Sequence, residues 1–502
     1  MTEQIKPIKK ILIANRGEIA MRIMRTAKEM GIKTIAVFSE ADENAPFVKF
    51  ADDGFLLGPP PSSESYLRGD LIVEAAINMG ADAIHPGYGF LSENAGFARL
   101  VTDSGLIFIG PSPEAMEVMG SKLAAKEAVS QYDIPMVPGT DHAITSIDEA
   151  KITAEEIGYP ILIKASAGGG GKGMRVVEKP EEAEENIQRA ISEAESAFGD
   201  GSVFIERYIS SPRHIEIQIM ADMHGNIVYL NERECSIQRR HQKVIEEAPC
   251  AIVTPEIRAA MGKDAVNVAR SCNYVGAGTV EFLMDENKDY YFLEMNTRLQ
   301  VEHPVTEMTT GYDMVEEQIH IAEGRELSFK QEDIKINGHA IEIRVYAEDP
   351  SRGFLPDIGT LYRYRKPKGA GIRVDDGFEE GMDIPIYYDP MLSKLVVHAK
   401  NRQNAIDKAI SAIDKYEING VATILPFCKY AINHESFRSG NFNTHFVKDY
   451  FSDPSVLNSD ETEQDLAAIF GAKFYNQKNA APLPKKEAGS HTRSPWYYKR
   501  MD

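Results

Sequence analysis

The sequence is poor in cysteine, and its few cysteines are scattered. The chain has 502 residues but only four cysteines, at positions 235, 250, 272 and 428. None of them forms a Cys-x-x-Cys pair, so their spacing suggests neither a zinc site nor a disulfide framework. Scattered cysteines in a long chain are typical of a reducing compartment, and we expect a cytoplasmic protein.

Long apolar runs and an excess of positive charge are also missing. No apolar stretch reaches the ~18 residues that suggest a transmembrane helix, and the short N-terminal run IKKILIA is too brief for a signal peptide, so no membrane association is expected. The net charge of −21, from 55 basic and 76 acidic residues, argues against nucleic-acid binding, which requires a basic face. A basic cluster within so acidic a chain is therefore informative.

The first part of the chain predicts an open parallel α/β domain. Residues 9–14 and 33–38 are short apolar runs, and a helical pattern ended by Gly31 lies between them. This strand–helix–strand order predicts a parallel sheet. The segments ADAIHPG and LIFIGPS repeat the order of an apolar strand and a Gly/Pro turn. Ligands of such sheets gather at the carboxyl ends of the strands.

The pattern changes near residue 121, where helical segments begin to alternate with strands. Strands are predicted at 160–165, 174–178, 203–207, 214–220, 226–231, 279–284, 289–295, 338–347, 359–365 and in YYDPMLSKLVVHA, with helices at 180–198 and 403–416. The last fifty or so residues contain an acidic stretch, a Pro/Lys/Ser-rich stretch that predicts a linker, and the aromatic end WYYKRMD. This end is either a docking element for a partner protein or a disordered terminus.

A run of four glycines lies in the segment KASAGGGGKGM, which spans Lys164–Met174. It is not a Walker A loop, because Ser166 and Gly173 replace the required first Gly and the final Ser or Thr. A GxGxxG match is present, but that loop should open a helix, whereas MRVVE predicts a strand. We interpret the segment as a hairpin whose backbone N–H groups cover phosphates, because consecutive glycines are entropically costly in an ordinary turn. A plain flexible loop is the alternative.

The segment EMNTRLQVE, from Glu294 to Glu302, carries polar residues at every second position. Side chains alternate between the two faces of a strand, so the even positions predict one polar face. Glu294 and Asn296 suit magnesium held against phosphates, and Glu281 in TVEFL can supply a further carboxylate. Arg298 suits a small planar anion, and Glu302 is a candidate general base. The alternative is a solvated face with salt bridges, although such faces usually carry Lys and Glu.

A second cluster, ECSIQRRHQKVIEE, concentrates positive charge in the middle of the chain. It brings together Arg239, Arg240, His241 and Lys243. A charge run is usually a solvated face, but this one opposes the global charge, which favours anion binding.

Ten motifs in order resemble the biotin carboxylase family of the ATP-grasp superfamily, over residues from about 8 to about 450. They are IANRGEIA, AIHPGYGFLSEN, FIGP, MGSK, KASAGGGGKGMR, PRHIEIQ, ERECSIQRRHQKVIEEAP, GAGTVEF, EMNTRLQVEHPVTEM and RVYAEDP. The resemblance implies a fold of the α/β and α+β classes with an open parallel α/β domain, an ATP-grasp domain with a glycine-rich lid, and a C-terminal mixed β domain. The implied ranges are 1–120, 121–320 with the lid at about 137–209, 321–450, and a linker and tail at 451–502.

The resemblance implies a ligase that carboxylates biotin with bicarbonate and ATP, by way of carboxyphosphate, with Mg²⁺ or Mn²⁺. The implied ATP-binding residues are Lys122, Lys164, Gly168, Gly169, Gly170, Gly171, Glu206, Ile209, His214, Gln238 and His241. The implied metal ligands are Glu281, Glu294 and Asn296. The implied bicarbonate site is Lys243, Arg298, Gln300, the backbone of Val301, and Glu302 as the base. For biotin, Tyr88 is expected to line the site and Arg344 to steady the enolate; Lys243, Arg298, Glu302 and Arg344 are the implied catalytic residues.

Departures from the family pattern are few: Ala167 stands where many members have Gly, and Arg207 where many have Lys. No AMKM-like biotinylation sequence is present, so we expect biotin on a separate biotin carboxyl carrier protein, with a carboxyltransferase subunit as a further partner and a homodimeric state. The motif IYYDPMLSKL at 386–395 favours an acyl-CoA carboxylase of fatty acid metabolism; the alternative is the biotin carboxylase subunit of a two-subunit pyruvate carboxylase.

Two other functions remain to be weighed against this one. An ATP-grasp ligase for another carboxylate is disfavoured by RLQVEHPVTE and Arg344. A non-catalytic nucleotide-binding scaffold predicts the loss of Glu302, Arg298 or Lys243, and all three are present.

Overall fold

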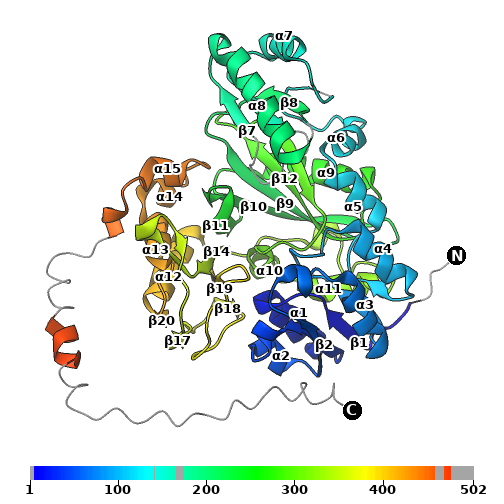
Figure 1. Ribbon diagram of the computed structural model, residues 1–502, viewed down its shortest axis with the longest axis vertical. Coiled ribbons are helices and arrows are strands. Elements are labelled where there is room, and N and C mark those ends of the chain that lie inside the picture. The colour runs from blue at the N-terminus through cyan, green and yellow to red at the C-terminus, as the bar shows by residue number, and fades with distance from the viewer. Residues whose placement is uncertain (1–4, 141, 166–173, 200, 458–468, 476–502) are drawn as a thin grey trace.

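The protein was analysed as a computed structural model that describes residues 5–140, 142–165, 174–199, 201–457 and 469–475. Figure 1 shows an N-terminal α/β part at the lower right, a lobe at the top, and a group of C-terminal helices on the left. A central sheet lies between these three parts. The predicted glycines at 168–171 and the aromatic end of the chain lie outside the described residues.

The N-terminal part is built on a five-stranded parallel sheet, as the sequence predicts. Its strands run in the order β3-β2-β1-β4-β5, and every neighbouring pair is parallel. Ile11, Leu12 and Ile13 of the central strand are fully buried, because helices cover both faces. The strands are β1 Lys10–Ile13, β2 Lys33–Ser39, β3 Asp53–Gly58, β4 Ala83–His85 and β5 Ile107–Phe108. The helices are α1 Gly17–Glu29, α2 Pro46–Phe50, α3 Gly69–Asn78, α4 Ala95–Asp103 and α5 Pro113–Gly120.

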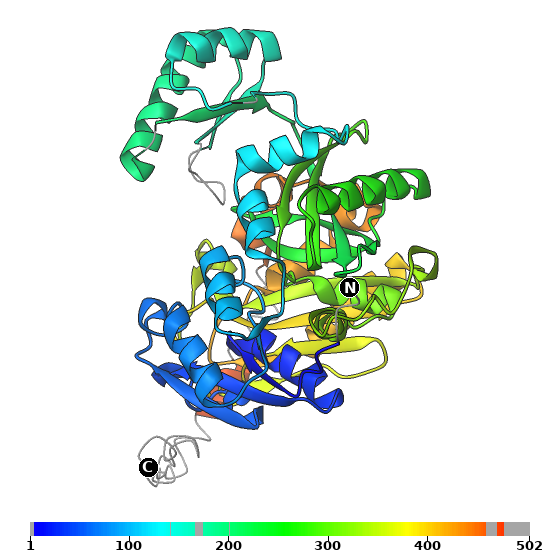
Figure 2. The same ribbon diagram turned by 90° about the vertical axis from the view of Figure 1, so that its right-hand side faces the viewer.

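The lobe contains a three-stranded antiparallel sheet in the order β7-β6-β8, formed by Ile161–Ala165, Met174–Val177 and Val203–Arg207 for β6, β7 and β8. β6 and β7 pair as a hairpin, as the glycine segment predicts. Helices α7 (Ile147–Ile157) and α8 (Ala183–Phe198) pack beside it. In α8 the buried residues Ala183, Ile187, Ala190 and Ala194 recur at helical spacing and form its apolar stripe. Figure 2 shows this lobe at the top, standing away from the rest of the molecule.

The central sheet has eight strands in the order β13-β12-β9-β10-β11-β14-β19-β18, and all neighbours are antiparallel. The strands are β9 Arg213–Ala221, β10 Ile227–Arg239, β11 Gln242–Ala248, β12 Gly276–Met284, β13 Tyr290–Asn296, β14 His339–Tyr346, β18 Ile372–Asp376 and β19 Met391–Ala399. The pairing of β11 with β14 joins the predicted ATP-grasp and C-terminal parts into one sheet. Side chains from both parts therefore meet on a shared surface.

The C-terminal strands β14, β19 and β18 pair antiparallel in this sheet. One detail differs from the sequence predictions. The strand predicted at 359–365 is confined to β17, Arg363–Arg365, since Leu361 hydrogen-bonds Met382 in a loop instead of a strand. Shorter strands are β15 Glu348–Asp349, β16 Leu355–Pro356 and β20 Glu417–Asn419.

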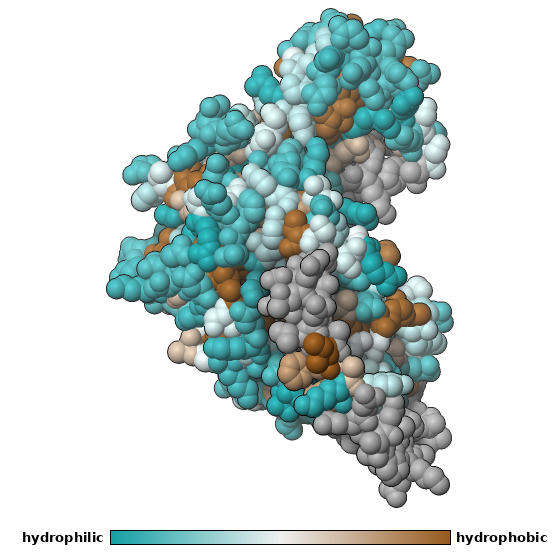
Figure 3. Space-filling view, turned by 90° about the vertical axis from the view of Figure 1, so that its left-hand side faces the viewer, coloured by the Kyte–Doolittle hydropathy of each residue, from teal (hydrophilic) through white to brown (hydrophobic). Residues whose placement is uncertain are grey.

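The remaining helices are α6 Lys122–Ser130, α9 Pro255–Ser271, α10 His303–Thr310, α11 Met314–Ala322, α12 Arg402–Asp414, α13 Leu425–Asn433, α14 Glu435–Ser439 and α15 Phe446–Tyr450. Of these, α12 to α15 form the left side of Figure 1, and α6 and α9 lie on its right. Within the described residues, no helix combines the length and the apolar character that a membrane crossing requires. The face in Figure 3 is mainly hydrophilic, with small separate hydrophobic areas.

Candidate active site

Lys243 reaches the interior through a tight β-hairpin. The turn between β10 and β11 contains Arg240 and His241, whose φ angles of 49° and 68° lie in the left-handed region. The predicted basic cluster is thus the tip of a hairpin, and its members separate. Arg240 and His241 are exposed at the turn, whereas the side chain of Lys243 is only 12% exposed.

Three carboxylates surround the ammonium group of Lys243. Its Nζ atom lies 2.5 Å from Glu216 Oε2, 2.8 Å from Glu281 Oε1 and 2.8 Å from Glu302 Oε1. Burial acts to lower the pKa of Lys243, but these carboxylates, Glu216 foremost, hold it well above its ordinary value. The lysine is therefore a permanent cation at the centre of the site.

Glu302 is held as a buried anion at the start of α10. Pro304 lies in the first turn of this helix, and Gly311, with φ of 86°, ends it. Burial acts to raise the pKa of Glu302, but the charge of Lys243 holds it below its ordinary value. The positive end of the helix adds to this stabilisation of negative charge. Glu302 is thus ionised and ready to accept a proton.

Arg344 binds the opposite oxygen of Glu302. Its NH2 atom donates to Glu302 Oε2 at 3.0 Å, and its Nε atom donates to Glu246 Oε1 at 2.6 Å. Lys394 lies beside this pair: its Nζ donates to the Val301 carbonyl at 2.9 Å and lies 5.9 Å from the centre of the Tyr88 ring. Lys394, which sequence reasoning missed, thus lies opposite Arg344 in the sheet and within 5.9 Å of the Tyr88 ring.

Arg298 is placed differently from the other predicted bicarbonate residues. Its guanidinium donates to Glu93 Oε2 at 2.9 Å and to Asn296 Oδ1 at 3.1 Å. Gln300, in contrast, accepts from Lys243 at 3.4 Å and donates to Glu281 at 3.0 Å. Gln300 is therefore integrated with the Lys243 cluster, and Arg298 is held at its edge by Glu93. Glu93 is part of the motif AIHPGYGFLSEN, which was the available sequence signal for it.

Arg233 is the main residue of the site that sequence reasoning missed. It is fully buried and donates through NH1 to Gln218 at 2.6 Å and to Thr306 at 3.0 Å, and through Nε to Glu216. Glu216 and Gln218 occupy alternate positions of the buried strand β9, together with His214. Polar side chains at every second position of an otherwise apolar strand were a usable signal.

Glu281 and Glu294, two predicted metal ligands, lie directly opposite each other on β12 and β13. Burial raises the pKa of Glu294, and the negative charge of Glu281 adds to the increase. Two carboxylates that repel each other in this way are suited to a divalent cation between them. Asn296 follows two positions after Glu294, and its Oδ1 atom, the oxygen that an amide offers to a cation, accepts from Arg298 at 3.1 Å. The predicted ligand set therefore fits a hard divalent cation.

A second group of possible metal ligands consists of His214, Glu216 and Glu281. The atoms that these side chains could offer to a metal lie within 4.8 Å of one another. Burial acts to lower the pKa of His214, but Glu281, 3.1 Å from its Nε2, raises it to about 9. Among these three side chains alone, His214 is thus a cationic partner of Glu281.

Lys164 and Glu206, two predicted nucleotide residues of the lobe, form an ion cluster with Lys126 of α6. Glu206 of β8 accepts hydrogen bonds from Lys164 and, at 2.6 Å, from Lys126 of α6. Burial and the charge of Lys164 lower the pKa of Lys122, while Glu294 acts in the opposite direction. Lys122 of α6 thus lies within electrostatic range of Glu294, a predicted metal ligand.

Three other predicted nucleotide residues lie on or near the hairpin and the lobe. Gln238 donates to the carbonyl of Cys235 at 2.8 Å, and His241 lies at the exposed hairpin turn. Ile209 is half-buried in the loop between β8 and β9. None of the three has a contact that tests its predicted role.

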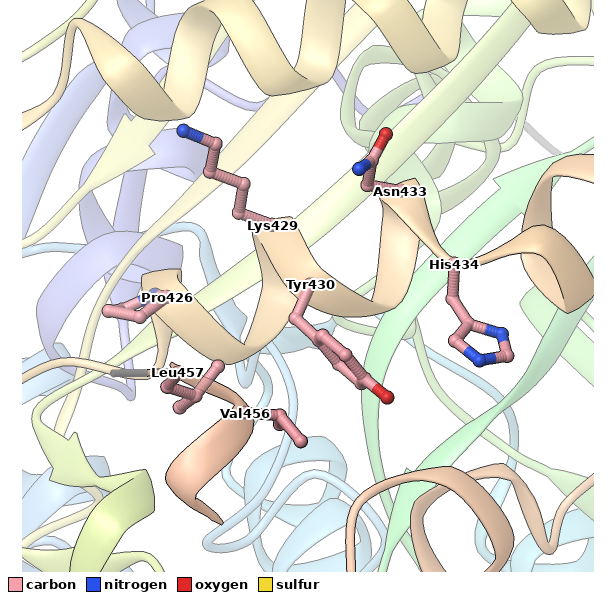
Figure 4. Close-up of a pocket in the computed structure, with 7 residues that line it drawn as sticks. All are labelled: Pro426, Lys429, Tyr430, Asn433, His434, Val456 and Leu457. Atoms are coloured by element: carbon pink, nitrogen blue, oxygen red, sulfur yellow. The ribbon is translucent and has the colours of Figure 1, made fainter. Parts of the chain in front are cut away.

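A surface pocket on the C-terminal helices is separate from this site. Figure 4 shows Pro426 and Tyr430 of α13 facing Val456 and Leu457 of the short helix η6 (Pro454–Leu457). The Tyr430 hydroxyl donates to the carbonyl of Tyr450 at 2.7 Å. None of the residues that line this pocket belongs to the predicted sites.

Three family models match the chain in sequence order. Residues 7–116 match the biotin carboxylase N-terminal domain, residues 121–330 the ATP-binding domain of the carbamoyl-phosphate synthase L chain, and residues 342–449 the biotin carboxylase C-terminal domain. The chain is 51% identical over 444 residues to biotin carboxylase 1 of Bacillus subtilis, with 88% of this chain and 99% of that protein covered.

Two other relatives are components of larger enzymes. The chain is 52% identical to one subunit of the pyruvate carboxylase of Methanothermobacter thermautotrophicus, over 94% of this chain and 97% of that protein. It is 50% identical to the propionyl-CoA carboxylase alpha chain of Sus scrofa, over 96% of this chain but only 67% of that protein.

Solved structures show the same fold. The biotin carboxylase domain dimer of 2-oxoglutarate carboxylase from Hydrogenobacter thermophilus, in complex with MgADP, ADP and bicarbonate, has a TM-score of 0.85 and 47% identity, with 91% of this chain and 100% of that chain covered. A biotin carboxylase complex from Campylobacter jejuni has a TM-score of 0.85 and 47% identity, with 88% and 99% covered.

Proposed function

Because the chain belongs to the biotin carboxylase family of ATP-dependent ligases, we propose that it carboxylates biotin on a separate carrier protein with ATP and bicarbonate. The observation that carries this proposal is the arrangement around Glu302, with Lys243 on one carboxylate oxygen and Arg344 on the other. Glu302, the proposed base, thus lies between two cations: Lys243, which is suited to bind bicarbonate, and Arg344, which is suited to bind biotin. The bicarbonate of the Hydrogenobacter complex and the nucleotides of both complexes support this assignment.

In the first step, Glu302 takes the proton of bicarbonate. Bicarbonate is a weak nucleophile until it is deprotonated, so a base beside fixed positive charge is required. An oxygen of the resulting carbonate forms a bond to the γ-phosphorus of ATP, and the bond between that phosphorus and the β,γ-bridging oxygen breaks. The products are carboxyphosphate and ADP. We assign the holding of bicarbonate to Lys243, Arg298, Gln300 and the backbone of Val301.

The nucleotide is proposed to lie between the lobe and the central sheet. Lys122 and Lys164 neutralise phosphate charge, with Glu206 aligning Lys164. We assign further nucleotide contacts to Ile209, His214, Gln238, His241 and the glycines at 168–171. Glu281, Glu294 and Asn296 would hold Mg²⁺ or Mn²⁺, which when bound neutralises the phosphates and orients them.

In the second step, carboxyphosphate decomposes to carbon dioxide and phosphate, and N1′ of biotin is carboxylated. Biotin gives up the N1′ proton to the released phosphate, and the nitrogen then bonds to carbon dioxide. Arg344 steadies the negative charge that develops on the ureido oxygen, and Tyr88 lines the biotin site. Arg344 is suited to this role because its guanidinium is buried and already fixed by two carboxylates.

The proposal is tested by ATP turnover in the presence and absence of bicarbonate and of free biotin. We expect phosphate release that requires bicarbonate and rises with biotin, together with the formation of carboxybiotin. Turnover that is indifferent to both compounds would instead indicate an ATP-grasp ligase for another carboxylate.

The carboxyl acceptor is a separate part of the proposal. The IYYDPMLSKL motif and the 50% identity to a propionyl-CoA carboxylase alpha chain support the first half-reaction of an acyl-CoA carboxylase. The match to the Methanothermobacter pyruvate carboxylase component, over 97% of its length, supports a two-subunit pyruvate carboxylase as the second candidate. Copurification of the carrier and carboxyltransferase subunits, followed by assays with acetyl-CoA, propionyl-CoA and pyruvate, distinguishes the two.

We further propose a homodimer, which the dimer of the Hydrogenobacter domain supports. We also propose domain boundaries near residues 120, 320 and 450; the limits of the family models support the first and the last, and the gap between two of the models at 330–342 lies shortly after the second.

A further inference from the structure

Two buried glutamates lie beside Arg344 in the central sheet. Glu246 of β11 and Glu342 of β14 are directly opposite each other in the antiparallel ladder, and both are fully buried. Directly opposite residues share one face of the sheet, with their β-carbons ~4.5–5.5 Å apart. Arg344 follows Glu342 by two positions and lies on the same face.

Most of the oxygen atoms of this glutamate pair are unsatisfied. Glu246 Oε1 accepts from Arg344 Nε at 2.6 Å. Glu246 Oε2 and both carboxylate oxygens of Glu342 are buried and have no hydrogen-bond partner among the described residues. Two adjacent buried carboxylates cannot both remain ionised without a large penalty, so one proton between them is the favourable state.

Neighbouring cations do not neutralise Glu342. Lys394 lies opposite Arg344 on β19, but its Nζ atom hydrogen-bonds the Val301 carbonyl at 2.9 Å and lies 3.3 Å from Glu18. Burial raises the pKa of Glu342 well above its ordinary value; Lys394 acts against this, and the charge of Glu246 adds to the increase. Burial also raises the pKa of Glu246 to about 7, although Arg344 acts to lower it. Of the two glutamates, Glu342 holds the proton more readily, because Arg344 hydrogen-bonds Glu246 and not Glu342.

We infer that Glu342 is protonated and that its O–H group donates a hydrogen bond to Glu246 Oε2, so that Glu246 remains an anion that fixes Arg344 throughout the reaction. This inference rests on the roles proposed for Glu302 and Arg344. At the start, the guanidinium is held by two carboxylates, Glu302 on NH2 and Glu246 on Nε. Once Glu302 has taken the proton of bicarbonate it is neutral, and its hold on NH2 weakens. Glu246 keeps its charge, so Arg344 stays in place while NH2 becomes available to the biotin oxygen.

Glu246 and Glu342 are thus positioning residues, and their effect should be confined to the biotin step. With free biotin as substrate, Glu246→Gln should lower the rate of carboxybiotin formation by at least ~10-fold, the scale of a lost charge-assisted hydrogen bond. Bicarbonate-dependent ATP cleavage without biotin and the KM for ATP should stay within ~2-fold of wild type, because Lys243 still holds Glu302 and the nucleotide contacts are proposed to come from other residues.

Two substitutions of Glu342 distinguish the effect of its proton from the effect of its side-chain size. Glu342→Leu removes the donor and should lower carboxybiotin formation as Glu246→Gln does. Glu342→Gln keeps an N–H donor for Glu246, so it should retain most of the rate of carboxybiotin formation that Glu342→Leu loses. The infrared carbonyl band of a protonated carboxylic acid should be present in wild type and absent from Glu342→Gln, in difference spectra at neutral pH. The exposed Glu117→Gln, with its side chain 54% exposed, is the matched control.

Several results would overturn the inference. One is carboxybiotin formation by Glu246→Gln at the wild-type rate. Another is an equal loss of ATP cleavage and biotin carboxylation in that variant, which would indicate a general structural role. A third is an infrared carbonyl band that persists in Glu342→Gln, because the proton would then be elsewhere. Wild-type protein without bicarbonate-dependent turnover would instead refute the proposed function, and the infrared result would still decide where the proton lies.

Discussion

At the residue scale, the site contains glutamates of one chemical type in different charge states. Glu302 has a lowered pKa because Lys243 outweighs its burial, whereas burial raises the pKa of Glu294 and raises that of Glu246 to about 7. The sequence identified Glu302 and Glu294 from their spacing in EMNTRLQVE. It could not assign charge states, because these depend on partners such as Arg233 that lie far away in the chain.

Replacing the proposed base is the most direct test at this scale. Glu302→Gln should lower bicarbonate-dependent ATP cleavage by ~10²–10⁴-fold, the usual contribution of a general base. Binding of ATP should persist, because the nucleotide contacts are proposed to come from other residues. Steady-state kinetics and ATP titration measure the two effects. With Glu117→Gln as the exposed control, full cleavage activity in Glu302→Gln would place the base elsewhere.

His85 predicts a pH dependence of stability that is independent of catalysis. It is fully buried, its Nδ1 accepts from the Gly87 amide at 3.1 Å, and burial lowers its pKa to about 3. The unfolded chain binds a proton near pH ~6.5 and the folded chain only near 3, so this contribution is complete above pH ~6.5 and is lost as the pH falls toward 3.

His85→Gln removes this titration. The difference in the free energy of unfolding between wild type and His85→Gln should be constant above pH ~6.5 and should shrink below it, by an upper bound of ~5 kcal/mol at ~1.4 kcal/mol per pKa unit. Chemical denaturation at several pH values measures it. His320→Gln, on a side chain that is 22% exposed, is the control. A difference that stays constant down to pH ~4.5 would show that His85 is protonated in the folded state.

At the element scale, periodicity predicted most strands and helices but not how they pair. The alternation in β13 and the stripe in α8 are local, so the sequence is enough to identify them. The extension of β10 to Arg239, beyond the predicted strand at 226–231, depends on β9 and β11 lying on either side. That pairing is formed by distant residues and has no local signature.

The close approach of Gly139 to strand β8 predicts that the packing of this strand supports nucleotide binding. A β-carbon added to Gly139 would lie 2.6 Å from the Ile205 carbonyl oxygen and 2.7 Å from Glu206 Cγ. Gly139→Ala should therefore displace Glu206 from Lys164 and Lys126. We expect a KM for ATP raised by ~10-fold and a loss of stability of ~1–3 kcal/mol, the scale of overpacking.

The matched control for this substitution is Gly120→Ala, because a β-carbon at Gly120 meets no atom within 4 Å. Thermal unfolding and ATP kinetics on both variants separate a local effect from a general one. An unchanged KM for ATP in Gly139→Ala would mean that the position of Glu206 does not govern nucleotide binding.

At the scale of the whole molecule, the site is assembled from parts that are remote in sequence. Lys243, Glu302 and Arg344 come from β11, the start of α10 and β14, and the pairing of β11 with β14 places them together. The resemblance implied these residues as one site, and the sequence order alone gave no reason for their contact. The physical reason is that the central sheet contains strands from both sides of the proposed boundary at residue 320.

The packing of Phe451 decides where a truncation that tests the C-terminal tail can be made. Phe451 is buried, and its ring packs 4.8 Å from that of Phe427 and 5.7 Å from that of Phe354. A cut after Tyr450 would remove this ring and disturb the core. A cut after Leu457 retains it, together with the helix η6 that lines the surface pocket.

We expect the chain truncated after Leu457 to keep its biotin-stimulated ATP turnover within ~2-fold, because every proposed catalytic residue remains. It should fail to retain the carrier and carboxyltransferase subunits in copurification, since the tail bears exposed apolar side chains suited to a partner. These are Ile469, Phe470, Phe474 and Tyr475, which are 58–70% exposed. A second truncation, after Tyr475, keeps them and removes Trp496–Tyr498, so it separates the two parts of the tail. If the shorter chain retains both partners as the full chain does, the tail is not the docking element, and the folded residues before 458 must hold the assembly together.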